Sequence, residues 1–416
     1  MTGGARRWDA IVVGGGPAGA TTALLLARAG TRVLLLERAW FPRDKPCSEY
    51  LSPAMTAVLE RLGDGGGILA EVERAPHAKL YGMRVVAPSG AAMVGRFSGD
   101  HGYPPPRPYS FALPRAVFDT ILLRAAQRAG AVVREGTAVE DLLFEDRAVA
   151  GVVARSPDGR RAAQHARVVV GADGLRSVVA RRLGLVRSSA PRRIAFSAHV
   201  AGVAGVDGLG ELHVSARGYV GLGPVGGGVT TVALVVPLGA VRRHAADFRA
   251  GFFDELERFP GLAGRFDAGR LVRAVLVTGP FARWARRPVA AGGGAVLVGD
   301  AADFFDPFTG QGLYSAVRGA ELAAACLIPA LARGVGSPIP ASTLRAYTRA
   351  RRRAFAGKWA LERLIGVGVG WPALSSRVVG RLARRTDLAD LLVGATGNFV
   401  PARRVLAPSF LGRLLW

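Results

Sequence analysis

The chain has 416 residues, half of them hydrophobic, so it can bury a large core and is too long for one small domain. Its formal charge is +24, but only Lys45, Lys79 and Lys358 among the 55 basic residues are lysines, which indicates a bias toward GC-rich codons. The basic residues are spread along the chain without aromatic interleaving or a helix-turn-helix pattern, so we expect no nucleic-acid partner.

The first predicted unit is a strand, a glycine-rich turn and a helix within "DAIVVGGGPAGATTALLLARAG". Residues 10–13 form a short apolar run that suits a buried parallel strand, and residues 18–29 form an alanine- and leucine-rich stretch of helical length. Gly14, Gly16 and Gly19 fall at the G-x-G-x-x-G spacing. The first glycine permits the turn, the second admits a pyrophosphate and the third allows close packing of helix and strand.

An adenylated cofactor is expected at this turn. The N-terminus of a helix stabilises an anion, which adds Pro17 and Ala18 to the candidate cofactor-binding residues. A second predicted strand over 32–36 ends at Glu37, where a carboxylate accepts from ribose hydroxyls in this motif, and Arg38 follows. The turn alone does not distinguish NAD from FAD.

The middle of the sequence is predicted to form short helices and strands. The loop "RAWFPRDKPCSEYLSP" leads into a predicted helix near 54–62. The segment "ARVVVGADGLRSVVARRLGL" repeats the order strand, glycine turn, helix. The remaining expectations are short strands and turns over 64–114, a helix over 115–129, and an antiparallel sheet with one wet face over 186–280.

The C-terminal part of the sequence is predicted to rejoin the nucleotide-binding domain that begins with the glycine-rich turn, and then to form a helical region. In "GGAVLVGDAADFFDPFTGQGLYSA" a buried strand over 295–298 meets a polar turn, and a helix follows after Gly312. Residues 340–416 are predicted to be mostly helical, with the basic clusters "RARRRAF" and "RLARR" beside apolar positions. Such helices are candidates for peripheral attachment to an anionic membrane surface.

Two further features bear on location. No N-terminal segment has the pattern of a signal peptide, because the first apolar run is needed as a strand. Cys47 and Cys326 give neither a metal-binding spacing nor a disulfide framework. We therefore expect no metal and a cytoplasmic location, with the inner face of the membrane as the alternative.

Three separated motifs resemble the FAD-dependent monooxygenase superfamily of the aromatic hydroxylase type. They are the turn at 14–19, "GADG" at 171–174, and "GD" followed by "DPFTGQG" at 299–312. The resemblance implies an α/β fold in which a Rossmann-type FAD-binding domain with a parallel sheet is split by an inserted antiparallel β-sheet substrate domain, with a C-terminal helical cap. The implied boundaries are 8–80, 115–185 and 281–335 for FAD binding, 81–114 and 186–280 for substrate, and 336–416 for the helical region.

The same resemblance implies roles for residues of these motifs. Asp300, preceded by Gly299, would accept a hydrogen bond from the ribityl chain of FAD. Arg115 would lie beside the FAD phosphates, with a solvated helix start as the alternative. Asp173 and Gly174 would shape a turn near the pyrophosphate and the approach of NAD(P)H, with a plain turn as the alternative. The residues implied to lie against the pyrimidine end of the flavin are Pro307, Gly310, Gly312 and Leu313.

Within the superfamily, "DKPCSEYLSP" and the motif from 299 onward are most similar to the geranylgeranyl reductase branch. Ser48 and Glu49 stand where that branch has glycines, and in "GYVGLGPVGGG" only Tyr219 remains of its aromatic substrate-lining motif. Cys47 and Tyr219 are the candidate catalytic residues. Cys47 would donate a proton or position the substrate, or else it is a small buried hydrophobe.

These features predict an FAD-dependent oxidoreductase acting on a lipophilic small molecule such as an isoprenoid, a quinone or an alkyl-aromatic compound. The expected reaction resembles the reduction of C=C bonds by geranylgeranyl reductases, with NAD(P)H as electron donor. One alternative is an NAD(P)H-dependent flavin monooxygenase that hydroxylates an aromatic or polyketide-type product. The other is a non-catalytic flavin-binding protein. The sequence indicates no oligomeric state.

Overall fold

The computed structural model describes residues 7–63, 67–99, 101–190, 192–240, 248–334 and 337–415. The strand that precedes the glycine-rich turn, β1, lies at the centre of a sheet. The parallel strands of this sheet run in the order β8-β2-β1-β11, with β19 beside β11. The antiparallel strands β10 and β9 continue the sheet beyond β11. The strands are β1 (Trp8–Val13), β2 (Val33–Leu36), β8 (Val132–Arg134), β9 (Ala138–Glu145), β10 (Ala148–Arg155), β11 (Arg161–Gly171) and β19 (Ala295–Leu297).

The register of this sheet places the ends of its central strands together. Val13 pairs with Leu36 on one side and with Gly171 on the other. Because parallel strands all point the same way, the turns that follow β1, β2, β11 and β19 meet at one edge of the sheet, where ligands bind in such folds. The three motifs found in the sequence therefore converge there.

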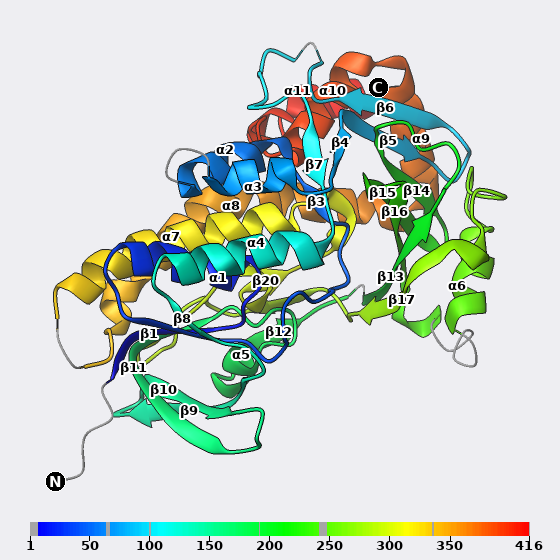
Figure 1. Cartoon of the computed structure of the whole chain (residues 1–416). Coiled ribbons are helices and arrows are strands. Elements are labelled where there is room, and N and C mark those ends of the chain that lie inside the picture. Colours follow the sequence, from blue (N-terminus) through cyan, green and yellow to red (C-terminus); the bar gives the residue numbers. More distant parts are fainter. Residues whose placement is uncertain are drawn as a thin grey trace, which may run out of the picture.

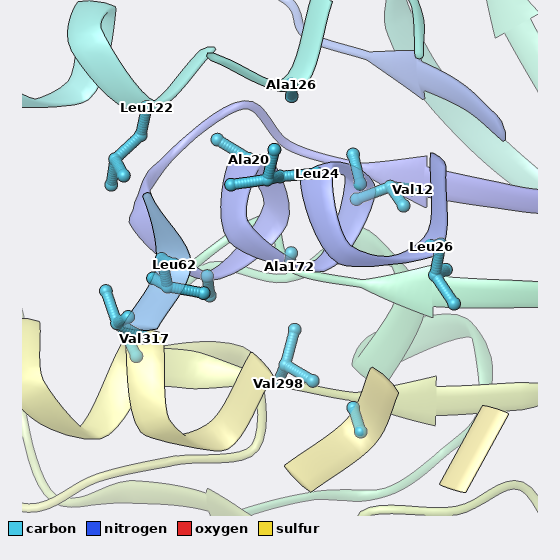
Figure 2. Packing of buried hydrophobic residues seen from close by; sticks show 14 of the residues in the cluster. Val12, Ala20, Leu24, Leu26, Leu62, Leu122, Ala126, Ala172, Val298 and Val317 are labelled. Carbon is cyan, nitrogen blue, oxygen red and sulfur yellow. The ribbon is translucent and has the colours of Figure 1, made fainter. Parts of the chain in front are cut away.

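Helices cover one face of the parallel sheet (Figure 1). Figure 2 shows α1 between α4 and α7, with Leu24 on α1, Leu122 on the α4 side and Val317 on the α7 side. The spacing of these buried apolar residues at helical period explains why the segments fold as helices against the sheet. These helices are α1 (Pro17–Arg28), α2 (Pro53–Leu62), α3 (Gly67–Arg74), α4 (Arg115–Arg128) and α7 (Gly312–Ala332), with α5 (Val178–Arg182) beside β9.

By length and composition α7 could also span a membrane, and within the described ranges it is the one helix that passes this test. It packs against α1 and α8, and its buried side includes Val317, Ala320 and Leu327. Less than half of its apolar stretch is buried, so packing in the core accounts for only part of its apolar character.

A second sheet forms the other part of the molecule, in the order β17-β13-β16-β15-β14-β5-β6. Its pairs are antiparallel except for β14 with β5, which are parallel. One face packs against α6, through Phe252 and Leu256. The elements are β5 (Gly82–Val86), β6 (Ala92–Arg96), β13 (Arg193–Ala201), β14 (Gly210–Ser215), β15 (Gly218–Gly226), β16 (Val229–Pro237), α6 (Phe248–Leu256) and β17 (Leu271–Thr278).

Two three-stranded sheets and the C-terminal helices complete the described chain. The helices lie over the other face of the second sheet (Figure 1) and share a core with it that includes Val85, Val235, Leu361 and Leu382. The small sheets contain β3 (Tyr50–Leu51), β7 (Ser110–Ala112) and β4 (Ala78–Leu80), and β12 (Val186–Ser188), β18 (Arg283–Ala285) and β20 (Asp303–Phe304). The helices are α8 (Ala341–Gly370), α9 (Pro372–Arg384), α10 (Thr386–Thr396) and α11 (Pro408–Leu415).

The predicted fold class is confirmed: a Rossmann-like parallel sheet is combined with further, largely antiparallel sheets and C-terminal helices. Three expectations for single segments were wrong. The sheet within 186–280 was expected to have one wet face, but one of its faces packs against α6 and the other against the C-terminal helices. The region 64–114 contains α3, and 186–280 contains α6, where only strands and turns were expected. Both helices are short, with eight and nine residues, so each has too few apolar residues to show a clear helical period in the sequence.

Candidate active site

The glycine-rich turn between β1 and α1 shows three different steric roles. A Cβ on Gly14, whose φ is +102°, would lie 2.6 Å from the carbonyl oxygen of Ala172, and one on Gly19 would lie 1.8 Å from that of Gly14. These two glycines are required by the protein's own packing. A Cβ on Gly16 would meet only Arg43 Nη2, at 3.6 Å, so Gly16 leaves space that the protein does not fill.

Glu37 lies at the end of β2, as predicted, and its carboxylate organises this turn. It accepts hydrogen bonds from the backbone N–H of Gly15 at 2.6 Å and of Ala39 at 2.8 Å. Arg38 is exposed beside it. The contact of Glu37 with a ribose stays a prediction.

A cavity of about 480 Å³ begins at this turn and runs between the two sheets toward the C-terminal helices. It brings together most of the residues predicted from the sequence, while Gly14, Gly19, Glu37, Arg38 and Asp173 stand outside its lining. The predicted residues that line it are Gly16, Pro17, Ala18, Cys47, Arg115, Gly174, Tyr219, Gly299, Asp300, Pro307, Gly310, Gly312 and Leu313.

Arg115 begins α4 and is buried rather than solvated. Its guanidinium donates two hydrogen bonds of 2.7 Å to the carboxylate of Asp119, one turn further along the helix. Arg43 Nη1 lies 2.7 Å from the same carboxylate. Burial lowers the pKa of Arg115, but the interactions with Asp119 and Cys47 together raise this pKa by more than burial lowers it. The net shift is upward, so Arg115 stays positively charged. One acid between two guanidiniums leaves positive charge beside the cavity, which suits a phosphate.

Asp300 follows β19 and lines the cavity together with Lys45. Burial raises the pKa of Asp300, while the nearby Lys45 opposes that shift. Burial likewise lowers the pKa of Lys45, partly offset by Asp300. Within the described ranges the structure shows no hydrogen bond or ion pair to the carboxylate of Asp300. An acceptor with spare capacity at this place fits a sugar-like hydroxyl.

The turn "DPFTGQG" at 306–312 also lines the cavity. Gly310 has a φ of +66°, and a Cβ there would approach the ring of Tyr50 to 3.0 Å. The turn leads directly into α7, whose N-terminus has no side-chain cap and lies at the cavity through Gly312 and Leu313. Unpaired N–H groups and the positive end of the helix dipole favour an electron-rich ligand atom here.

Asp173 and Gly174 are neighbours with different roles: Asp173 stabilises the turn, and Gly174 lines the cavity. The Asp173 carboxylate accepts from Ser177 Oγ and from the N–H of Val178, both at 2.6 Å, and so fixes the start of α5. Burial raises its pKa. This geometry agrees with the interpretation of Asp173 as a turn residue. Gly174, with a φ of +76°, lines the cavity close to Lys45.

The two candidate catalytic residues both line the cavity, but their surroundings differ. Tyr219 Oη donates a 2.6 Å hydrogen bond to Asp306, which also pairs with Arg193 at 2.7 Å. Burial and the carboxylate of Asp306 raise the pKa of Tyr219 well above its usual value. Tyr219 therefore keeps its proton. The half-buried thiol of Cys47 interacts with the guanidinium of Arg115.

Glu49 was missed as a site residue, although its place at a glycine position of the reductase branch was a signal. It is buried with a φ of +61°. Its carboxylate accepts from the N–H of Arg115 at 2.9 Å, pairs with His199 at 2.6 Å, and bonds to Thr231. These bonds lower the pKa of Glu49 although burial alone would raise it. Glu49 thus ties the Cys47 loop to the second sheet and to α4.

The residues around the cavity fit FAD. Three features support this: the open side of Gly16 at the N-terminus of α1, the carboxylate of Asp300 with spare capacity, and the uncapped N-terminus of α7. They suit a pyrophosphate, a ribityl chain and a flavin ring in that order. Arg43 and Arg115 would balance the phosphate charge.

Asp300→Ala is expected to lower the affinity for FAD by about 10- to 100-fold, because a hydrogen bond to a charged acceptor contributes about 1.5–3 kcal/mol. The free energy of unfolding should stay near the parental value, since the carboxylate faces a cavity. Titration of the apoprotein with FAD and urea denaturation measure the two effects. Asp158→Ala, which removes an exposed carboxylate from the turn between β10 and β11, is the control. Unchanged FAD affinity in Asp300→Ala would refute the ribityl contact.

Comparisons with known proteins agree with this geometry. The family model described as "FAD binding domain" matches residues 7–360. Digeranylgeranylglycerophospholipid reductase 2 of Methanothermobacter thermautotrophicus is 31% identical over 341 residues, covering 79% of this chain and 80% of that protein. Conditioned medium factor receptor 1 of Dictyostelium discoideum is 30% identical over 343 residues, which cover 78% of this chain but only 64% of that protein.

Among solved structures, the myxobacterial chondrochloren halogenase CndH superposes with a TM-score of 0.75 at 26% identity, covering 86% of this chain and 82% of that one. The reductase and the halogenase are both similar to this chain over most of its length. The chain therefore belongs to the FAD binding domain family and is an FAD-dependent oxidoreductase of the monooxygenase-type superfamily.

Proposed function

We propose that this enzyme reduces a C=C bond of a lipophilic, elongated substrate, such as an isoprenoid, a quinone with an isoprenoid chain or an alkyl-aromatic compound. The observation that carries the proposal is the shape and lining of the cavity. It continues from the flavin-binding turns into a region walled by apolar side chains of the second sheet and the C-terminal helices. That part is lined by Met83, Val85, Met93, Leu212, Val214, Leu361, Ile365, Val369, Val378, Val379, Leu382, Leu392, Val393, Phe410 and Leu414.

The similarity to a digeranylgeranylglycerophospholipid reductase supports the same reaction class, since that protein's name states an isoprenoid lipid as substrate. Membership of an enzyme family argues against a non-catalytic flavin-binding protein. We further propose NAD(P)H as the electron donor and the cytoplasm as the location. The two cysteines, which form no disulfide, are consistent with a reducing compartment.

Reduction of a C=C bond needs a hydride on one carbon and a proton on the other. When bound and first reduced by the electron donor, the flavin would supply the hydride. Of the two candidate residues, Tyr219 already donates its hydroxyl proton in a hydrogen bond to Asp306. Cys47 instead lies beside the cationic Arg115. The geometry therefore supports Cys47 as the proton donor.

One observation favours a second candidate, hydroxylation of an aromatic compound. On β15, a Cβ on Gly221 would lie 3.6 Å from the nearest atom, in Leu212, and one on Gly223 would lie 3.7 Å from the carbonyl oxygen of Ser48. Packing does not require glycine at either position, so these two residues widen the cavity instead. The extra space beside Ser48 suits a substrate with a ring.

Cys47→Ser is expected to slow substrate reduction by at least about 10-fold, since a positioned acid typically contributes 10²- to 10⁴-fold. The measurement is anaerobic flavin reoxidation by an isoprenoid diphosphate in the FAD-loaded, prereduced enzyme. Cys326→Ser, which removes the other cysteine from α7, is the matched control and should retain the parental rate. Equal rates in both variants would assign Cys47 to packing, and turnover only with oxygen would favour the hydroxylase.

A further inference from the structure

The outer side of α8 carries an apolar stripe near its C-terminal end. Ala360, Leu364 and Val367 follow one another at steps of four and three residues and so lie on one side of the helix, and Trp371 is the first residue after the helix ends at Gly370. These four residues are here called the α8 stripe. Leu364, Val367 and Trp371 are 44%, 61% and 60% exposed. Single exposed apolar side chains are ordinary, but three of them within eight residues at one end of a helix are a candidate interaction site.

The other side of the same segment lines the cavity. Ile365 and Val369 belong to the apolar lining, and Ser375 Oγ bonds to the carbonyl of Gly368 at 2.6 Å, which ties α9 to α8 at this corner. Leu364 belongs both to the lining and to the exposed surface. The apolar end of the cavity therefore lies directly behind the α8 stripe.

The charges around the stripe have one dominant sign. The acidic residues of 341–416 are Glu362, Asp387 and Asp390. Glu362 is buried against Lys358, and Asp387 is paired with Arg385 and Arg413. Arginines are numerous in the same region, and Arg363 is exposed beside Leu364. An apolar stripe with the exposed Arg363 beside it, in a region where arginines far outnumber carboxylates, is complementary to a bilayer with anionic headgroups.

We propose that the α8 stripe seats this protein on the surface of an anionic lipid bilayer, with the apolar end of the cavity facing the membrane. A lipophilic molecule would then pass from the acyl region into the cavity without crossing water. This membrane-binding surface is a separate property from the proposed reaction. Binding to vesicles needs neither substrate nor turnover, so either idea can fail without the other.

The test is cosedimentation of the FAD-loaded protein with phosphatidylglycerol vesicles and, separately, with phosphatidylcholine vesicles. We expect binding to the anionic vesicles that weakens when NaCl is raised to about 0.5 M. Trp371→Ala and Val367→Ser should each lower the partition coefficient by about 10-fold, because each removes apolar surface from the acyl boundary. Neither residue belongs to the cavity lining, so turnover of a detergent-solubilised substrate should stay parental.

Matched controls exist elsewhere on the surface. Trp40 and Val272 are 65% and 58% exposed, and Trp40→Ala and Val272→Ser should leave vesicle binding unchanged. The proposal is wrong if the parent binds no anionic vesicle, or if the control variants weaken binding as much as the stripe variants. It is also wrong if sedimentation velocity shows a lipid-free dimer that Trp371→Ala dissociates, since the stripe would then be a contact between copies.

Discussion

Gly16→Ala is expected to lower the affinity for FAD by about 10- to 100-fold and to change the free energy of unfolding of the apoprotein by less than about 1 kcal/mol. The new Cβ would meet only Arg43 Nη2, at 3.6 Å, so the protein itself can accommodate it. The methyl group would instead occupy space at the N-terminus of α1 where a pyrophosphate has to approach. Calorimetric titration with FAD and urea denaturation of the apoprotein measure the two quantities.

Gly19→Ala is the contrasting variant. Its Cβ would fall 1.8 Å from the carbonyl oxygen of Gly14, a backbone atom that can move only if β1 and α1 separate. We expect a loss of at least about 3 kcal/mol in the stability of the apoprotein, before any cofactor is added. If Gly16→Ala destabilises the apoprotein as much as Gly19→Ala, or leaves FAD affinity unchanged, the assigned roles of the two glycines are wrong.

Glu49→Ala is expected to destabilise the protein by about 3 kcal/mol, because it leaves His199 and Thr231 without a buried partner. Glu49→Gly removes the same bonds but suits the φ of +61° better, so it should be more stable than the alanine variant by about 1 kcal/mol. Urea denaturation at neutral pH measures both values. Equal stability of the two variants would show that the backbone at 49 is not strained.

The Glu49 pairs also predict a pH dependence. The pKa of Glu49 is lower in the folded state than in the unfolded chain, because the bonds to His199 and Thr231 outweigh burial. Its contribution to stability is therefore complete above the unfolded pKa of about 4.3 and is lost as the pH falls through the folded value. Between about pH 5 and pH 3 the parent should lose stability more steeply than Glu49→Gln. Parallel curves would contradict this.

Those parts of the site that rest on local motifs were predictable from the sequence. The strand, the turn and the helix at 8–28 are contiguous, so the spacing of Gly14, Gly16 and Gly19 fixes their roles before any long-range contact is known. The same holds for the turn at 306–312. In each case the chemistry is carried by backbone groups within one short segment.

Contacts between distant segments were not predictable. Tyr219 reaches Asp306, and Glu49 reaches His199 and Thr231, only because the second sheet folds over the first domain. Nothing in the local sequence of either partner indicates such a pair. The pairing of Arg115 with Asp119 is local, at i,i+4 spacing on a predicted helix, but the sequence analysis did not predict it.

The most direct test of the account is the mass of the product formed by the prereduced, FAD-loaded enzyme from an isoprenoid diphosphate, a prenylated quinone or an alkylresorcinol, with and without oxygen. The proposed reduction predicts that, without oxygen, the isoprenoid diphosphate gains two hydrogens at one of its C=C bonds, a mass change that quinol formation cannot produce in this substrate. A product that forms only with oxygen and gains one oxygen atom would contradict the reductase account.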